Sequence, residues 1–192
     1  MKKWNILDRF IAFLRYSKVE KYIRKDDVIV DIGCGREGNF LLNYKDIIKK
    51  VYGFDYRIEN HVIDNIEFIN NKSLNNFPLK KNSVDTVFLL AVLEHLDEPE
   101  KVLFDALKIL KKGGNLVLTI PTPMAKPILE FMAFKLHIIN EDEIREHKKY
   151  YNKKMIQDLV LRLNKKVKVE LMCYKYFELG VNSFIVITKK IK

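Results

Sequence analysis

Short apolar runs alternate with polar, helix-forming segments along most of the chain. Seven of these runs have the length of a strand, and they cover residues 28–32, 51–55, 66–69, 83–92, 115–121, 166–177 and 182–190. The run at residues 83–92 is apolar enough to be buried on both faces of a sheet. Only a short turn joins the last two runs, so we expect them to pair antiparallel.

Helical periodicity accompanies the strands. Trp4, Leu7, Ile11 and Leu14 recur at helical spacing, which predicts a helix or a broken pair of helices over residues 4–23. Further helices are expected from about residue 37, from about residue 97 and over residues 152–163. Strands that alternate with helices predict an α/β fold: a doubly wound, mostly parallel, seven-stranded, Rossmann-like sheet with an antiparallel C-terminal hairpin. We expect one domain over residues 1–192.

Composition narrows the class of protein. The chain is 48% hydrophobic, which is enough for a core, and no apolar run reaches the ~18 residues of a membrane span. No segment resembles a signal peptide. The 2 cysteines, Cys34 and Cys173, form neither a disulfide framework nor a metal-site pattern. We therefore expect a cytoplasmic protein without a transmembrane segment.

The formal net charge of +10 suggests nucleic acid, anionic lipid or an acidic substrate as a partner. The lysines are scattered, however, and the densest groups, at residues 15–25, 145–154 and 162–168, fit solvated helix faces or helix ends. Charge alone therefore does not favour a nucleic-acid partner.

The stretch DIGCGREG follows the first predicted strand and contains three of the chain's 7 glycines, Gly33, Gly35 and Gly38. Asp55 ends the second strand, 20 residues after Gly35, where a ribose-binding carboxylate is expected. A strand, a glycine loop and a helix together favour a nucleoside-bearing ligand at the carboxyl edge of the sheet. Both NAD and S-adenosylmethionine carry an adenosine. Asp31, two residues before Gly33, would repel a pyrophosphate but would suit a ligand with an ammonium group, which favours S-adenosylmethionine.

VDIGCGREG, followed by GFD, resembles motif I and the acidic loop of class I S-adenosylmethionine-dependent methyltransferases. The segment FPLKKNSVDTVFLLAVLEHLDEPEKVLFDALKILKKGGNLVLTIPTP and the closing hairpin extend the resemblance to about residues 15–190. It is similar to the small-molecule branch that includes the ubiquinone-pathway O-methyltransferases. The resemblance implies a seven-stranded sheet with S-adenosyl-L-methionine across the carboxyl ends of its first, second and fourth strands.

The resemblance also implies roles for single residues. Asp31, Gly33 and Gly35 would surround the methionine part of the cofactor, with Cys34 tolerated beside it as a small residue. Asp55 would hold the ribose and Tyr56 would pack on the adenine. The remaining expected contacts are Leu90 and Arg15 at the methionine end, and Ser73 beside Leu74 at the adenine. Ser73 is a departure, because the family often has an acidic residue at this position.

The acceptor is less well defined. The chain reads LAVLEHL after the fourth strand, so the Asn-Pro-Pro-Tyr or Asp-Pro-Pro-Tyr signature of amide and adenine methylation is absent, and neither cysteine suits a cytosine-C5 nucleophile. His95 and His147 are the catalytic candidates as general bases, with Glu94 beside His95. Structural roles for both histidines remain alternatives. No carboxylate spacing near them predicts a metal site.

The thirty or so residues after the fifth strand, 121–151, are longer than an ordinary connection. We predict that they cover the acceptor, with an apolar first half that includes Phe131 and Phe134 and a charged second half that includes His147. The interpretation is a methyltransferase for an O or N atom of a small, partly apolar acceptor, lipid-like or aromatic. The alternatives are an RNA or tRNA methyltransferase, a non-catalytic S-adenosylmethionine-binding protein, and an NAD-dependent dehydrogenase, which Asp31 disfavours.

Overall fold

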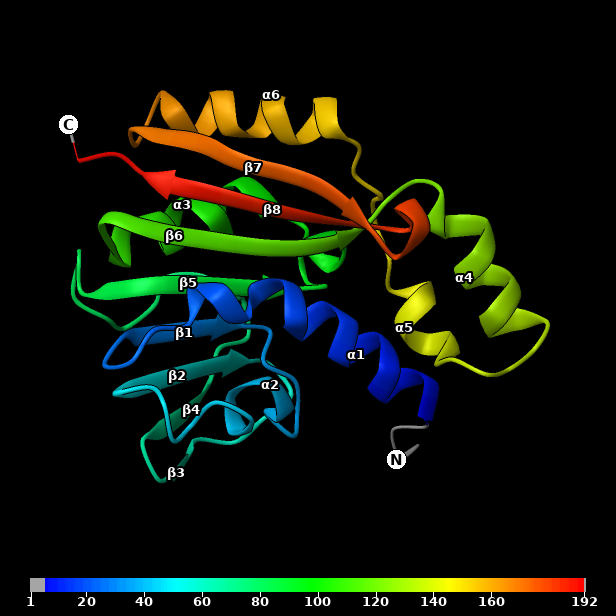
Figure 1. The fold of residues 1–192 in the computed structure, drawn as a ribbon, viewed down its shortest axis with the longest axis horizontal. Coiled ribbons are helices and arrows are strands. Elements are labelled where there is room, and N and C mark those ends of the chain that lie inside the picture. The colour runs from blue at the N-terminus through cyan, green and yellow to red at the C-terminus, as the bar shows by residue number, and fades with distance from the viewer. Residues whose placement is uncertain (1–5, 192) are drawn as a thin grey trace.

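A single twisted sheet forms the centre of the molecule in the computed structural model, which describes residues 6–191 (Figure 1). Its strand order is β3-β4-β2-β1-β5-β6-β8-β7. The strands are β1 (Val28–Ile32), β2 (Lys50–Asp55), β3 (His61–Ile63), β4 (Ile66–Asn70), β5 (Val84–Leu90), β6 (Leu110–Pro121), β7 (Val169–Phe177) and β8 (Asn182–Lys189). The five strands from β4 to β6 in this order pair in parallel, whereas β3, β8 and β7 run antiparallel to their neighbours.

The predicted α/β class and the antiparallel C-terminal hairpin are confirmed, and all seven predicted strands are present. The structure adds an eighth strand, β3, which pairs antiparallel with β4. It has only three residues and all of them are exposed, so it lacks the long buried apolar run from which the other strands were predicted.

Helices cover both faces of the sheet. They are α1 (Ile6–Val19), α2 (Asn39–Leu42), α3 (Pro99–Ile109), α4 (Ala125–Phe134), α5 (Glu141–Arg145) and α6 (Lys153–Asn164), with short 3₁₀ turns η1 (Glu20–Tyr22), η2 (Leu93–His95) and η3 (Glu178–Gly180). Side chains alternate along β1, so that Val30 joins the core under α3 and α6, while Ile29 joins the core under α1 and α2. Each face of the sheet is thus closed by its own apolar cluster.

The helix expected after the glycine loop is wrong in length, because α2 has only four residues. Gly38 has a φ of 58°, so the chain is still turning where the helix was expected to begin. The N-terminal helix is present from Ile6, and Trp4 lies outside the described residues. Asn152 begins α6 as predicted, since its side chain accepts a hydrogen bond from the Met155 N–H.

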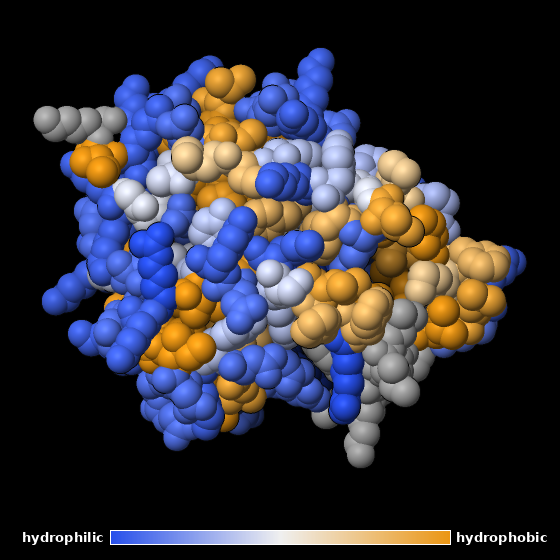
Figure 2. Space-filling model, viewed as in Figure 1, coloured by the Kyte–Doolittle hydropathy of each residue, from blue (hydrophilic) through white to orange (hydrophobic). Residues whose placement is uncertain are grey.

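The segment 121–151 leaves β6 and folds into α4 and α5, which lie together beyond one end of the sheet, beside the N-terminal part of α1 (Figure 1). Figure 2 shows apolar side chains gathered on this side of the molecule, where Met124, Phe131 and Leu179 are exposed. Among residues 6–191, no helix is long and apolar enough to cross a lipid bilayer.

Candidate active site

A cavity of about 1050 Å³ lies at the carboxyl edge of the sheet. Its walls come from the loops after β1, β2, β4 and β5, together with α1, α4 and α5. All the expected cofactor and catalytic residues line this one cavity: Arg15, Asp31, Gly33, Cys34, Gly35, Asp55, Tyr56, Ser73, Leu74, Leu90, His95 and His147. Residues far apart in the sequence therefore meet in one place, as the predicted topology requires.

The glycine loop owes its shape to two positive φ angles. Gly33 has a φ of 77°, and a Cβ added there would lie 2.4 Å from a methyl carbon of Val92. Gly35 has a φ of 73°, and an added Cβ would meet nothing within 4 Å. Gly33 is thus required by packing, whereas Gly35 leaves open space at the cavity.

Asp31 is buried at the end of β1, with 2% of its surface exposed, and its Oδ1 atom has no hydrogen-bond partner among the described residues. Burial, and secondarily the charge of Asp55, raise the pKa of Asp31 to about 8. A buried carboxyl without a partner is costly. The site is therefore built to receive a donor or a cation at this atom.

Asp55 is buried as well, but its carboxylate is fully engaged. It accepts hydrogen bonds from the Gly35 N–H at 2.9 Å and from the Arg57 N–H at 2.8 Å. The Arg57 guanidinium adds contacts at 3.2 and 3.4 Å and lies 5.2 Å from the centre of the Tyr56 ring. Sequence reasoning missed Arg57, although its position two residues after the acidic strand end is a signal that could have identified it.

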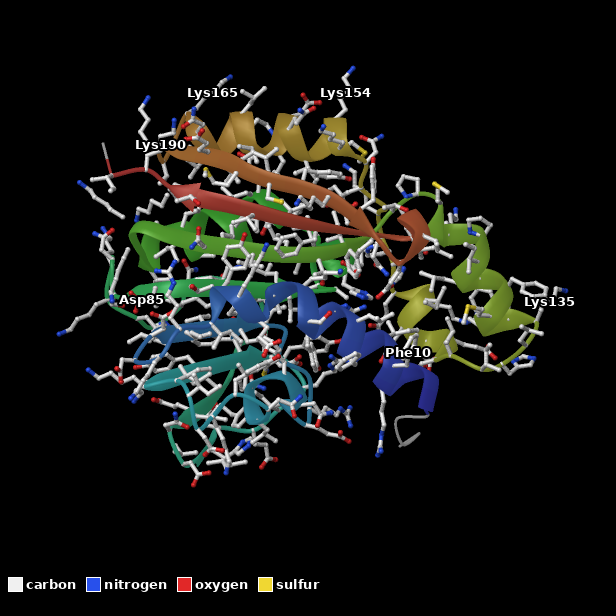
Figure 3. All side chains as sticks on the ribbon, in the orientation of Figure 1. Phe10, Asp85, Lys135, Lys154, Lys165 and Lys190 are labelled. Atoms are coloured by element: carbon white, nitrogen blue, oxygen red, sulfur yellow. The ribbon has the colours of Figure 1, made fainter. Side chains whose placement is uncertain are left out.

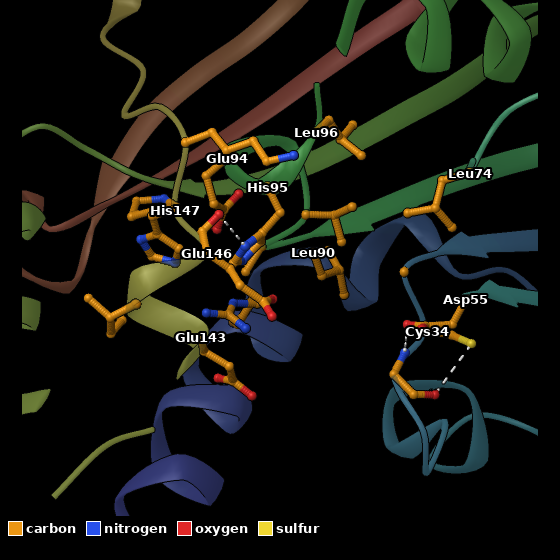
Figure 4. A pocket seen from close by; sticks show the side chains of 18 of the residues that line it. Cys34, Asp55, Leu74, Leu90, Glu94, His95, Leu96, Glu143, Glu146 and His147 are labelled. Atoms are coloured by element: carbon orange, nitrogen blue, oxygen red, sulfur yellow. Dashed lines mark hydrogen bonds between the residues drawn. The ribbon is translucent and has the colours of Figure 1, made fainter. Parts of the chain in front are cut away.

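His95 and His147 meet although 52 positions separate them in the sequence. Their ring centres are 4.7 Å apart at an interplanar angle of 70° (Figure 4). The backbone explains this contact, because the N–H groups of Lys148 and Lys149 donate to the Glu94 carbonyl at 2.9 and 3.3 Å. The segment after α5 is thereby fixed to η2, directly after β5.

Both imidazoles are neutral near pH 7. Burial, followed by the neighbouring charge of His95, lowers the pKa of His147 to about 4, and burial also lowers the pKa of His95. His95 Nδ1 lies 3.2 Å from the Glu146 carbonyl oxygen, and His147 Nδ1 lies 2.9 Å from the Tyr150 hydroxyl oxygen. A neutral imidazole has one nitrogen lone pair, so either ring can accept a proton or hold a metal ion.

Glu94 has a more prominent place in the cavity than its sequence position predicted, since the sequence only identified it as the neighbour of His95. It is 1% exposed, and its Oε2 atom has no hydrogen-bond partner in the described part of the chain. Burial raises the pKa of Glu94 to about 7, even though a backbone hydrogen bond and the charge of Arg15 act in the opposite direction. Sequence spacing indicated no metal site, yet donor atoms of Glu94, His95 and His147 all lie within 4.8 Å of one another.

Part of the cavity lining is aliphatic. Leu129 and Met132 of α4 and Ile139 and Ile144, in and before α5, contribute to it. Phe131 and Phe134, which were expected in the cover, are not among the lining residues. Phe131 is 55% exposed on the outer side of α4, and Phe134 packs under the Arg145 guanidinium at 5.0 Å. The lining face of α4 is therefore aliphatic rather than aromatic.

Comparison with known proteins identifies the domain. The pattern of a family described as "Methyltransferase domain" matches residues 5–167. The tRNA U34 carboxymethyltransferase of Desulfotalea psychrophila is 30% identical over 116 residues, which cover 54% of this chain and 36% of that protein. The enzyme of the same name from Campylobacter fetus is 27% identical over 117 residues, or 54% of this chain and 40% of its own length. The chain thus spans well under half the length of these relatives.

A solved structure of a SAM-dependent methyltransferase from Thermotoga maritima superposes with a TM-score of 0.66 at 21% identity, covering 95% of this chain and 90% of that one. The glycine loop, the acidic strand ends and the cavity lie together at the carboxyl edge of the sheet, the edge at which open α/β sheets bind ligands. The chain belongs to the methyltransferase-domain family and is an S-adenosylmethionine-dependent methyltransferase domain.

Proposed function

We propose that this domain transfers a methyl group from S-adenosylmethionine to an oxygen or nitrogen atom of a small acceptor with an apolar part. The observation that carries the proposal is that two kinds of side chain line one cavity. Neutral His95 and His147 line it together with the aliphatic side chains Leu129, Met132, Ile139 and Ile144. A small molecule with a polar end and an apolar body matches such a lining.

The residues around the glycine loop fit the methionine part of the cofactor. The unpartnered Asp31 carboxyl would accept hydrogen bonds from its ammonium group, and the buried Arg15 Nε–H, also without a partner in the described chain, would donate to its carboxylate. Gly33 and Gly35 keep the loop open, and Leu90 lies at the same end. The buried polar atoms that lack partners are thus complementary to the charges of this ligand.

The nucleoside part requires one rearrangement. We assign the ribose to Asp55, the adenine face to Tyr56, and the adenine edge to Ser73 and Leu74. Because the Arg57 side chain uses the Asp55 oxygens, Arg57 has to turn outward when the ribose hydroxyls bind. Its side chain is 34% exposed, so the move does not need a change in the fold.

When bound, S-adenosylmethionine supplies a methyl group that the lone pair of the acceptor displaces from a positively charged sulfur, on which the electrons of the broken bond remain. The chain's own contribution is to align the acceptor and to exclude water. In this proposal His95 and His147 would receive the proton that an acceptor hydroxyl or ammonium loses, and their neutral state near pH 7 supports this role. The segment 121–151 would act as the acceptor cover.

A tRNA acceptor is the second candidate. It is favoured by the names of the curated relatives and by the net charge of +10. Against it, the lysines are not confined to one face: Figure 3 shows Lys135 beyond α4 at one end of the molecule, far from Lys154, Lys165 and Lys190 beside α6 and the end of β8.

The test is methyl transfer from S-adenosylmethionine labelled in its methyl group. One arm uses phenols, isoprenoid alcohols and aliphatic amines, and the other uses unmodified tRNA. We expect label in a member of the first panel, and turnover should fall in the His147→Ala variant. Label in tRNA alone would contradict the small-acceptor proposal and would establish the second candidate.

A further inference from the structure

Three potential metal ligands converge in the acceptor half of the cavity. Donor atoms of Glu94, His95 and His147 all lie within 4.8 Å of one another, and Figure 4 shows the three side chains together. Two imidazoles and one carboxylate form a common ligand set for Zn²⁺ and neighbouring divalent transition metals. Sites of this composition keep a coordination position open for a substrate or a water molecule.

The hydrogen bonds leave suitable lone pairs. A carbonyl oxygen can only accept, so His95 Nδ1 carries the proton in its contact with Glu146, and Nε2 holds the free lone pair. His147 is oriented by Tyr150 through its own Nδ1. Ring nitrogens held in this way by a second partner are typical of histidines that bind a metal through the other nitrogen.

Glu94 supplies the independent observation. Its carboxyl is almost fully buried in the cavity wall, and its Oε2 atom has no partner in the described residues. Such an atom is costly unless something binds it. Nearby positive charges on Arg15, Arg57 and Lys148 would oppose a cation, but Glu143 and Glu146 line the same cavity and add negative charge.

We propose that Glu94, His95 and His147 bind one divalent transition metal ion of the zinc class. Ligands on one such ion lie on the order of 3.4 Å apart. The donor atoms, which lie within 4.8 Å of one another, must therefore approach by up to about 1.4 Å, which rotamer changes allow. The role of the ion rests on the proposed function. The ion would bind the hydroxyl oxygen of the acceptor at its open coordination position. It would thereby lower the pKa of that hydroxyl group, whose proton would pass to solvent. The ion and a proton compete for the same imidazole lone pairs, so metal binding replaces proton uptake by the histidines.

The experiment titrates the purified protein with Co²⁺ and Zn²⁺, without cofactor or acceptor. Co²⁺ binding is followed by its visible absorption and Zn²⁺ binding by calorimetry. We expect one ion per chain and a loss of affinity of roughly tenfold or more in His147→Ala and in Glu94→Gln. The matched control is His137→Ala, which removes an exposed histidine that contacts Glu141 and should leave binding unchanged.

Circular dichroism establishes that each variant is folded, and Glu94→Gln keeps the side-chain volume in case His147→Ala is unstable. Absence of stoichiometric binding, or equal affinity in wild type, His147→Ala and Glu94→Gln, would overturn the proposal. Titration of the same samples with S-adenosylhomocysteine tests the cofactor site separately. A failure of metal binding is therefore distinguishable from a failure of the proposed function.

Discussion

At the scale of single residues, Asp31 links cofactor binding to pH. Burial raises the pKa of Asp31 to about 8, so the free protein holds a proton there at neutral pH. An ammonium group binds the carboxylate form, so binding below pH 8 must release that proton. We expect the affinity for S-adenosylhomocysteine to rise about tenfold between pH 6 and pH 7. Calorimetry in two buffers of different ionisation enthalpy measures the release directly.

The control for this prediction is Asp31→Asn. The amide is close in size but has no proton to lose in this range, so the variant should bind more weakly and without the pH dependence. Proton release of the same size in Asp31→Asn would assign the linkage to another group.

Arg57 competes with the cofactor for Asp55. The Arg57 guanidinium uses both carboxylate oxygens of Asp55. Arg57→Ala should therefore strengthen S-adenosylhomocysteine binding by roughly threefold to tenfold, because a contact with the net value of one typical hydrogen bond, about 0.5–1.5 kcal/mol, no longer has to be broken. Arg36→Ala removes an exposed arginine of the neighbouring glycine loop. Arg36 itself does not line the cavity, so its loss should change little. A weaker complex in Arg57→Ala would show that Arg57 binds the cofactor instead.

Residue contacts were predictable only where a motif fixes them. The glycine loop and Asp55 follow from spacing along adjacent strands, whose carboxyl ends must meet. The contact between His95 and His147 depends on the hydrogen bonds from Lys148 and Lys149 to the Glu94 carbonyl, and no spacing in the sequence encodes these bonds. The burial of Glu94 has the same origin, which is why the candidate metal cluster could not be predicted.

At the scale of elements, one side of α4 lines the cavity and another side faces solvent. Leu129 and Met132 line the cavity, whereas Phe131 is exposed. We expect Met132→Ala to raise KM for a small apolar acceptor by about tenfold, because roughly two methylene-sized groups lose their burial. Affinity for S-adenosylhomocysteine should stay within about twofold, since α4 faces the acceptor half of the cavity.

Phe131→Ala is the matched control on the same helix, and although it removes a larger side chain it should leave KM unchanged. Equal effects of Met132→Ala and Phe131→Ala would remove α4 from the acceptor site.

The strands were easier to predict than the connections between them. A strand buried on both faces is mostly apolar. The central strand β5 shows this as an unbroken apolar run from Val87 to Leu90, which is visible in the sequence. The exposed β3 and the four-residue α2 have no comparable pattern, because their conformations depend on pairing with β4 and on the positive φ of Gly38.

At the scale of the whole molecule, the charge of +10 does not mark one binding face. Many cations are used locally, as in the pairs of Arg162 and Lys166 with Glu100 at 3.0 and 2.9 Å and of Lys111 with Asp85 at 2.7 Å. If tRNA is not the acceptor, we expect the protein to bind tRNA only weakly. The logarithm of the association constant should then fall with the logarithm of the salt concentration with a slope of magnitude below about 3. Fluorescence anisotropy between 50 and 200 mM salt gives the slope, and a magnitude above about 6 would indicate the phosphate contacts of a tRNA enzyme.

The position of the cofactor is the central claim, because the acceptor, the histidines and the candidate metal cluster are all placed relative to it. The most direct measurement is calorimetric titration of wild type, Asp55→Asn and Ser73→Ala with S-adenosylhomocysteine, with NAD as the comparison ligand. We predict that one S-adenosylhomocysteine binds per chain and that NAD gives no heat of binding. The loss of binding free energy should be larger in Asp55→Asn, about 1.5–3 kcal/mol, than in Ser73→Ala, about 0.5–1.5 kcal/mol. Heat with NAD alone, or an Asp55→Asn variant that binds as tightly as wild type, would contradict the account.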